Sequence, residues 1–113
     1  MYTPSAFEIK ELAQCQRFVE SYSFGLLLSP DLSASHVPFL LDRENGEQGS
    51  LYCHLARANR QWRQFVDQQV LVVFSGPHAY ISPTWYEQGP AVPTWNYGAV
   101  HVRGKVELLD EVQ

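Results

Sequence analysis

Two segments in the C-terminal half of the chain constrain the fold most. Residues 69–76, QVLVVFSG, have the clearest strand pattern, and residues 96–109, NYGAVHVRGKVELL, alternate apolar and polar side chains over a longer stretch. Gly76-Pro77 interrupts the first segment, and the strand pattern resumes over 78–82. Gly98 and Gly104 allow bends or bulges in the second segment. Long strands are therefore the main expected elements.

Three shorter segments raise the expected number of strands to about six. Residues 23–29 favour a short buried strand, residues 34–42 a second one and residues 50–56 a third. Pro38 has no N–H group to donate to a neighbouring strand. We therefore expect the 34–42 strand to lie at a sheet edge or to carry a bulge.

A helix is expected near residues 9–21. Ser5–Glu8 has the spacing of a capping box, which marks helix starts. The apolar residues that follow recur at the helical period and give the helix one buried face. They are Leu12, Cys15, Phe18 and Val19.

A second, short helix is expected after Asn59, because asparagine is a good N-cap residue. Its inward-facing residues would be Trp62, Phe65 and Val66. Neither helix alternates with strands in a βαβ rhythm, and short turns join most of the strands. This order favours an antiparallel α+β barrel or sandwich over a parallel sheet.

The length and composition predict one globular domain over residues 1–113. No apolar run approaches the ~20 residues of a membrane span, and the N-terminal segment lacks the pattern of a secretory signal. Cys15 and Cys53 form no CxxC pair. We therefore expect two reduced thiols in a cytoplasmic protein.

Several kinds of site have no support in the sequence. The histidines are widely spaced and predict no metal site, and we expect each to be a hydrogen-bonded side chain on a strand. No GxSxG elbow and no glycine-rich phosphate loop occurs. A net charge of −4 argues against broad nucleic-acid binding. The histidines are His36, His54, His78 and His101.

The segment from Cys53 to Trp62, CHLARANRQW, joins the end of an expected strand to the start of an expected helix. Two interpretations of Arg57 compete there. It could be an ordinary surface cation in a basic cluster with Arg60 and Arg63. It could instead complete an anion site with the N–H groups of the helix N-terminus, since a guanidinium suits a phosphate.

A second unusual segment covers residues 83–95, PTWYEQGPAVPTW. It contains three prolines and a glycine, which favour loops, together with two tryptophans and a tyrosine. Such side chains need to be buried against something. Trp85, Tyr86 and Trp95 could cover the core of their own barrel. They could also contact a partner subunit or stack on a planar ligand.

Several stretches of the sequence resemble a known family. The stretches HLARANRQWRQF, VLVVFSGPHAYISPTWY and AVPTWNYGAVHVRG closely resemble the PaiB family, the FMN-binding negative transcriptional regulators, and MYTPSAF and SFGLLLS resemble its start. The resemblance covers essentially the whole chain. It implies a six-stranded antiparallel Greek-key split barrel with two peripheral helices, of the FMN-binding type.

The same resemblance implies a homodimer with FMN between the subunits. The flavin phosphate would lie near the strand–helix corner formed by Ala56, Arg57 and Asn59, which favours the anion-site interpretation of Arg57. His54 would share a strand face with Ala56. The other side chains expected to contact the flavin are Ser35, His36, Val37, Pro38, Trp62 and Trp95.

The family name implies repression of transcription, although no helix-turn-helix or other DNA-reading element occurs in the sequence. A DNA partner would therefore have to bind through Arg60 and Arg63. The alternative is a flavin-dependent oxidoreductase that uses NAD(P)H, with the chemistry supplied largely by the cofactor. PaiB-like chains usually continue beyond LLDEVQ, so we expect a domain that is truncated at its C-terminus relative to the family.

Overall fold

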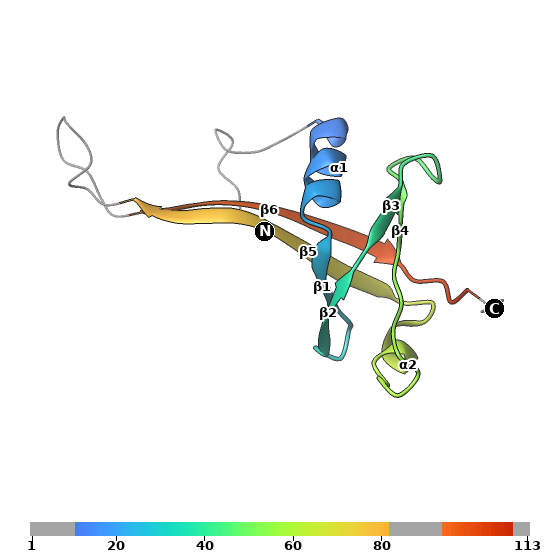
Figure 1. Ribbon diagram of the computed structural model, residues 1–113. Coiled ribbons are helices and arrows are strands. Elements are labelled where there is room, and N and C mark those ends of the chain that lie inside the picture. The colour runs from blue at the N-terminus through green and yellow to red at the C-terminus, as the bar shows by residue number, and fades with distance from the viewer. Residues whose placement is uncertain (1–10, 82–93, 110–113) are drawn as a thin grey trace, which may run out of the picture.

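The computed structural model describes residues 11–81 and 94–109, with two helices and six strands among them (Figure 1). The side chains described are those of residues 11–77 and 98–109. The capping-box residues Ser5–Glu8 and most of the aromatic segment lie outside the described residues. The helices are α1 (Leu12–Ser21) and α2 (Trp62–Phe65), and the strands are β1 (Phe24–Leu28), β2 (Ala34–Pro38), β3 (Leu40–Asp42), β4 (Ser50–Tyr52), β5 (Gln69–Ile81) and β6 (Thr94–Lys105).

The strands form two antiparallel sheets. Four of them pair in the order β2-β1-β5-β6, and β3 and β4 form a separate hairpin. The expected mostly β, α+β fold with six antiparallel strands and two helices is confirmed. Within the described residues the two sheets do not join into a closed barrel, and the arrangement is consistent with a split barrel.

Residues 34–42 form two strands instead of one. β2 ends at Pro38, and β3 begins at Leu40 in the other sheet. Between them, the Phe39 N–H donates to the Ser23 carbonyl at 2.9 Å, which closes the hairpin with β1 where the chain leaves this sheet. β2 is an edge strand, as the missing N–H of Pro38 predicted.

The predicted break at Gly76-Pro77 is wrong, because β5 runs from Gln69 to Ile81 without ending there. Ser75 pairs with Ala99 and His78 pairs with Tyr97, so Gly76 and Pro77 together oppose the single residue Gly98. This is a β-bulge, which accommodates a proline without breaking the strand. The bend or bulge expected at Gly98 is confirmed, whereas Gly104 pairs regularly with Val70.

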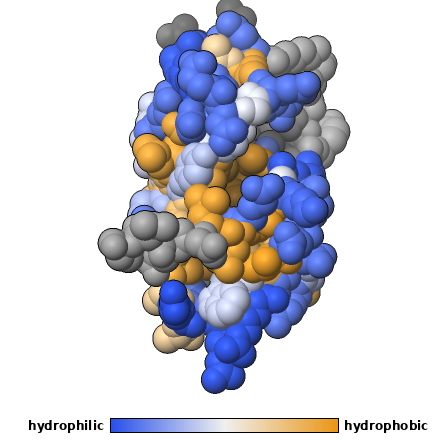
Figure 2. Space-filling view, turned by 90° about the vertical axis from the view of Figure 1, so that its right-hand side faces the viewer, coloured by the Kyte–Doolittle hydropathy of each residue, from blue (hydrophilic) through white to orange (hydrophobic). Residues whose placement is uncertain are grey.

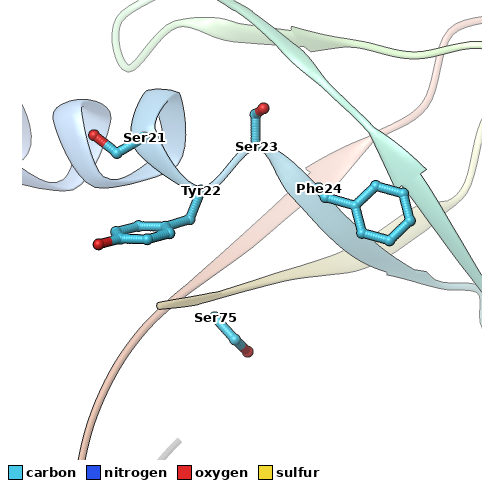
Figure 3. A pocket seen from close by; sticks show the side chains of 5 residues that line it. All are labelled: Ser21, Tyr22, Ser23, Phe24 and Ser75. Carbon is cyan, nitrogen blue, oxygen red and sulfur yellow. The ribbon is translucent and has the colours of Figure 1, made fainter. Parts of the chain in front are cut away.

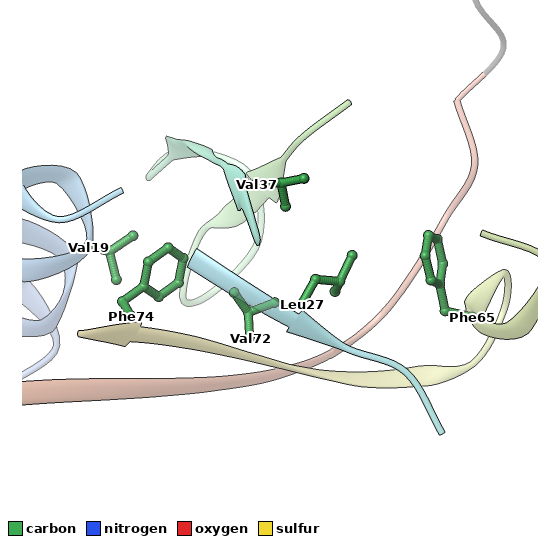
Figure 4. Packing of buried hydrophobic residues seen from close by; sticks show 6 residues of the cluster. All are labelled: Val19, Leu27, Val37, Phe65, Val72 and Phe74. Carbon is green, nitrogen blue, oxygen red and sulfur yellow. The ribbon is translucent and has the colours of Figure 1, made fainter. Parts of the chain in front are cut away.

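The core lies between α1, the four-stranded sheet and α2 (Figure 4). Phe74 of β5 is completely buried and contacts the edge of the Phe39 ring, with the ring centroids 5.5 Å apart. In α1 only Val19 of the predicted apolar face is buried, and Leu12 is 43% exposed. The buried cluster is Val19, Leu27, Val37, Phe65, Val72 and Phe74.

Two glycines make room for α1 on the long hairpin. A Cβ atom at Gly76 would lie 2.7 Å from the Phe18 ring, and one at Gly98 would lie 2.9 Å from it. Real Cβ atoms do not approach other heavy atoms so closely. The bulge therefore presents bare backbone from both strands to the Phe18 ring, and this contact seats α1.

We expect Gly76→Ala to lower the free energy of unfolding by about 1–3 kcal/mol, because the new methyl group overpacks against Phe18. Gly104→Ala is the matched control, since a Cβ there meets nothing within 4 Å. Chemical denaturation of both variants and of Gly76→Ala combined with Phe18→Leu measures the effect. Equal stabilities of the two alanine variants, or no recovery in the double variant, would contradict the contact.

Leu32, in the turn between β1 and β2, has a backbone φ of +70° and an 87% exposed side chain. The left-handed conformation costs a non-glycine residue about 1–2 kcal/mol, and this side chain gains little burial in return. We expect Leu32→Gly to raise the free energy of unfolding by up to about 1 kcal/mol, part of the relief being offset by glycine's larger unfolded-state entropy. Leu40→Gly is the control, because Leu40 is similarly exposed and has no positive φ, and it should destabilise the fold.

Candidate functional site

The predicted strand–helix corner is a compact turn. β4 ends at Tyr52, so His54 and Ala56 do not lie on a strand, and the predicted shared strand face is wrong. Both residues are exposed in the connection that follows. The turn closes where the Asn59 N–H donates to the Ala56 carbonyl at 2.9 Å.

The helix after this turn is shorter and begins later than predicted. α2 has four residues, its N-cap residue is Gln61, and no side chain caps it. Asn59 caps the preceding turn instead, since its Oδ1 accepts from the Gln61 N–H at 3.1 Å. The inward positions were predicted correctly: Phe65 is buried, and Trp62 and Val66 pack against the core.

A four-residue helix gives no substantial dipole, so the helix N-terminus cannot form half of an anion site as expected. Arg57, Arg60 and Arg63 are all exposed within this corner and the first turn of α2. The Arg57 carbonyl accepts from Trp62 Nε1 at 3.2 Å, and the Arg63 guanidinium lies 5.4 Å from the centroid of the Trp62 ring. This contact with Trp62 holds the turn against α2.

Gln61 is a buried polar residue that sequence reasoning missed. Gln61 is only 6% exposed, and its side-chain nitrogen lies 2.8 Å from the Ser33 carbonyl, 3.1 Å from the Leu27 carbonyl and 3.2 Å from the Ser29 hydroxyl. Its Oε1 accepts a hydrogen bond from the Ser35 hydroxyl. A glutamine two residues after a predicted N-cap, in a polar segment, gives no sequence signal of burial.

Ser35 and Asn59 complete this network. Asn59 Nδ2 donates to Ser35 Oγ at 3.1 Å, although the two residues are 24 positions apart. The predicted corner and the predicted flavin-facing strand β2 are therefore in direct contact. Ser35, Asn59 and Gln61 form a cyclic hydrogen-bond network, here called the corner network.

The four predicted residues of β2 do not share one face. Ser35 and Val37 point toward the interior, with Val37 only 8% exposed, whereas His36 and Pro38 are exposed. Val37 is part of the core, so only its backbone is available to a ligand. The His36 ring stacks on the exposed Phe24 ring, with centroids 6.0 Å apart and planes inclined by 14°.

Trp95 lies far from the corner within one chain. Its backbone pairs with Tyr80 of β5, and its side chain is outside the described residues. Ser35 is in register, through Leu27, with Val72 of β5. Tyr80 lies further along that strand by roughly 25 Å at the usual rise per residue. One chain therefore does not bring Trp95 to the corner network.

A shallow hollow of about 420 Å³ lies at another place, between the end of α1, the start of β1 and β5 (Figure 3). Its lining is Ser21, Tyr22, Ser23, Phe24 and Ser75. It contains none of the predicted contact residues, but Phe24 connects it to His36 through the stacked rings.

No group of three or more potential metal ligands occurs within residues 11–81 and 94–109. Across these ranges no helix has the length and apolar character needed to span a membrane. Neither Cys15 nor Cys53 forms a disulfide.

Apolar side chains are exposed over the middle of one face of the molecule (Figure 2).

A family model described as "Putative FMN-binding domain" matches residues 1–113. The chain is 38% identical to the protease synthase and sporulation protein PAI 2 of Bacillus subtilis over 98% of this chain and 55% of that protein. An uncharacterized protein of Saccharomyces cerevisiae is 33% identical over 96% of this chain and 79% of its own length. An uncharacterized protein of Emericella nidulans is 28% identical over 96% of this chain and 57% of its own length. The chain thus spans little more than half of the bacterial relative.

The turn that supports the corner network predicts a pH dependence of stability. Asp31 accepts hydrogen bonds from the Ser29 hydroxyl at 2.8 Å, from the Ser33 N–H at 3.1 Å and from the Ser33 hydroxyl at 2.9 Å. These donors, that of Ser29 first, lower the pKa of Asp31 below its ordinary value. The carboxylate therefore stabilises the fold above the unfolded-state pKa, which is about 3.9, and this contribution is lost as the pH falls through the lower folded-state pKa.

We expect Asp31→Asn to be less stable than the natural chain at pH 7, with a difference that stays constant down to about pH 4 and shrinks below it. Denaturant titrations at several pH values between 7 and 2.5 measure this. Ser33→Ala removes the hydroxyl donor to Asp31 and should reduce the pH-dependent part of the free energy of unfolding. A difference that is independent of pH over the whole range would refute the assignment.

Proposed function

Because this chain belongs to the FMN-binding domain family over its whole length, we propose that it is the flavin-binding domain of a PaiB-like regulatory protein, with FMN held at a subunit interface. FMN is the cofactor that the family membership assigns. The single observation that carries the proposal is the Asn59–Ser35 hydrogen bond of 3.1 Å. It joins the two segments, 35–38 and 56–59, that were expected separately to contact the flavin.

The corner has the donor groups that a phosphate requires. Arg57 and Arg60 are exposed, and the segment from Cys53 to Val66 contains no carboxylate. The backbone N–H groups of Ala58 and Arg60 donate to no acceptor among the described residues. Guanidinium forks and backbone N–H groups that lack an acceptor are the usual donors to a phosphate group, so these residues fit that end of FMN.

β2 offers a place for the rest of the cofactor. It is an edge strand, so its outer backbone groups are not paired within the four-stranded sheet. His36 and Phe24 add an exposed aromatic surface at the far end of this strand from the turn. When bound, FMN supplies hydride or electron transfer, while the chain binds and orients it.

A homodimer would account for two further features. Trp95 pairs with Tyr80, which lies roughly 25 Å along β5 from Val72, the residue in register with Ser35 through Leu27. It would therefore reach this flavin only from a second copy. Large apolar side chains are also exposed on the described surface, including Leu40, which is 70% exposed, and Leu109, which is 64% exposed. Exposed apolar surface of this kind is typical of protein interfaces.

The regulatory role is proposed from the likeness to the Bacillus subtilis protein, and a cytoplasmic location goes with it. Direct DNA contact would have to use the exposed Arg60 and Arg63, because the net charge of −4 attracts no phosphate backbone. These guanidiniums lie in the same corner as Arg57. DNA and the flavin phosphate would therefore compete for one cluster of cations.

We expect Arg57→Ala to raise the Kd for FMN by about 10–100-fold and to change the Kd for riboflavin less than threefold, since riboflavin lacks the phosphate. Flavin fluorescence titrations of the purified protein measure both constants. Arg17→Ala is the control, because Arg17 is an exposed arginine on α1 outside the corner, and it should bind both flavins as the natural chain does.

An equal rise in the Kd values for FMN and riboflavin in Arg57→Ala would show that the corner does not hold the phosphate. Absence of saturable FMN binding by the natural chain would refute the proposed function itself. NADPH oxidation by the FMN-loaded protein above the rate with FMN alone would indicate an oxidoreductase.

A further inference from the structure

We propose that Gln61 is a positioning residue that makes the Ser35–Asn59 pair a binding site for a ribityl hydroxyl group of the flavin, and not for its phosphate. This inference rests on the proposed function. It comes from the direction of each hydrogen bond in the corner network, which backbone groups fix at both ends.

The first end is the carboxamide of Gln61. Its nitrogen lies 2.8 Å from the Ser33 carbonyl and 3.1 Å from the Leu27 carbonyl, and carbonyl oxygens can only accept hydrogen bonds. The nitrogen must therefore face β1, and Oε1 must face Ser35. Because Oε1 can only accept, the Ser35 hydroxyl has to donate its proton to Gln61.

The second end is the backbone N–H of Gln61, which can only donate. It lies 3.1 Å from the side chain of Asn59, so the oxygen of that amide must face it and the nitrogen must face Ser35. Ser35 Oγ therefore accepts from Asn59 and donates to Gln61. Both ends of the network require the same directions, and no alternative set satisfies all of these groups.

Two unused groups remain at the half-buried Ser35 and Asn59. The only proton of the Ser35 hydroxyl is committed to Gln61, so Ser35 can offer a ligand a lone pair and nothing else. Asn59 Nδ2 has a second hydrogen, which has no acceptor among the described residues. The pair therefore presents one acceptor beside one donor.

This pattern selects the part of FMN that binds there. An ionised phosphate can only accept hydrogen bonds, so the Ser35 lone pair would repel it. A hydroxyl group both donates and accepts, and it can bond to Ser35 and Asn59 together. The ribityl chain carries such hydroxyls close to the phosphate, and Asn59 lies only two residues from Arg57 along the chain.

The test compares FMN, riboflavin and lumiflavin, which has the ring system without the ribityl chain. We expect Ser35→Ala and Gln61→Met each to raise the Kd for FMN and for riboflavin by the same three- to tenfold, and the Kd for lumiflavin less than twofold. Ser35→Thr keeps the hydroxyl and should bind all three flavins within twofold of the natural chain. Thermal melts establish that each variant folds. Should Gln61→Met not fold, the Ser35→Ala and Ser35→Thr pair decides the outcome.

If Ser35→Ala raises the Kd for FMN alone, the phosphate binds at Ser35 and the inference is overturned. If it raises the Kd for lumiflavin as much as for the other two flavins, the flavin ring binds there and the inference is overturned too. The Arg57→Ala result is independent, because it separates FMN from riboflavin. Suppose that Arg57→Ala leaves the Kd for FMN unchanged, while Ser35→Ala raises the Kd for FMN and for riboflavin equally. The placement of the phosphate at Arg57 then fails, and the inference about Ser35 stands. If the natural chain binds none of the three flavins, both proposals fail.

Discussion

The buried carboxamide of Gln61 is the interaction on which the arrangement of the site depends. It links the end of β1, the β1–β2 turn, strand β2 and the corner before α2 through hydrogen bonds to Leu27, Ser29, Ser33 and Ser35. A buried polar group without partners typically costs about 1–3 kcal/mol, so this side chain can be buried only if those segments stay together. Every buried side-chain nitrogen and oxygen in the described part of the chain has a partner. No buried atom of the network therefore lacks a partner, and the directions of its hydrogen bonds are fixed by backbone groups that cannot reverse.

The site differs from the simple picture of an arginine beside a helix dipole. α2 is too short to provide a dipole, and the turn from Ala56 to Gln61 takes its place. What remains of the anion-site hypothesis is a group of exposed arginines on a turn whose segment contains no carboxylate, together with backbone N–H groups of Ala58 and Arg60 that donate to no acceptor among the described residues. In the proposed site a phosphate would be bound without a glycine-rich loop. The proposal also separates two roles, with the cations assigned to the phosphate and the neutral Ser35–Asn59 pair to a hydroxyl.

The fold places these groups at the edge of a small structure with much exposed surface. β2 is an edge strand, and the β5–β6 hairpin carries Trp95 away from the corner of its own chain. A cofactor bound at the corner would lie against an open edge and would need further cover. A second copy of the chain could supply that cover, which agrees with the proposed interface site. The seat of α1 on Gly76 and Gly98 serves a separate purpose, since it anchors the helix to the hairpin.

Local pattern was sufficient for the class of fold. Alternation predicted the long strands, the missing N–H of Pro38 predicted the edge position of β2, and helical spacing predicted the inward face of α2, because each depends on the chemistry of neighbouring residues. The same reasoning placed Arg57 and Asn59 in a candidate site, whereas Ser35 entered that site only through the family resemblance. Tertiary structure alone decided that β5 continues through Gly76-Pro77, since the bulge exists only opposite Gly98 of another strand. It alone decided that His54 and Ala56 leave the strand, that Val37 enters the core and that Gln61 is buried. The partners of the Gln61 side chain lie 26 to 34 residues away along the chain, and no local pattern encodes hydrogen bonds over such separations.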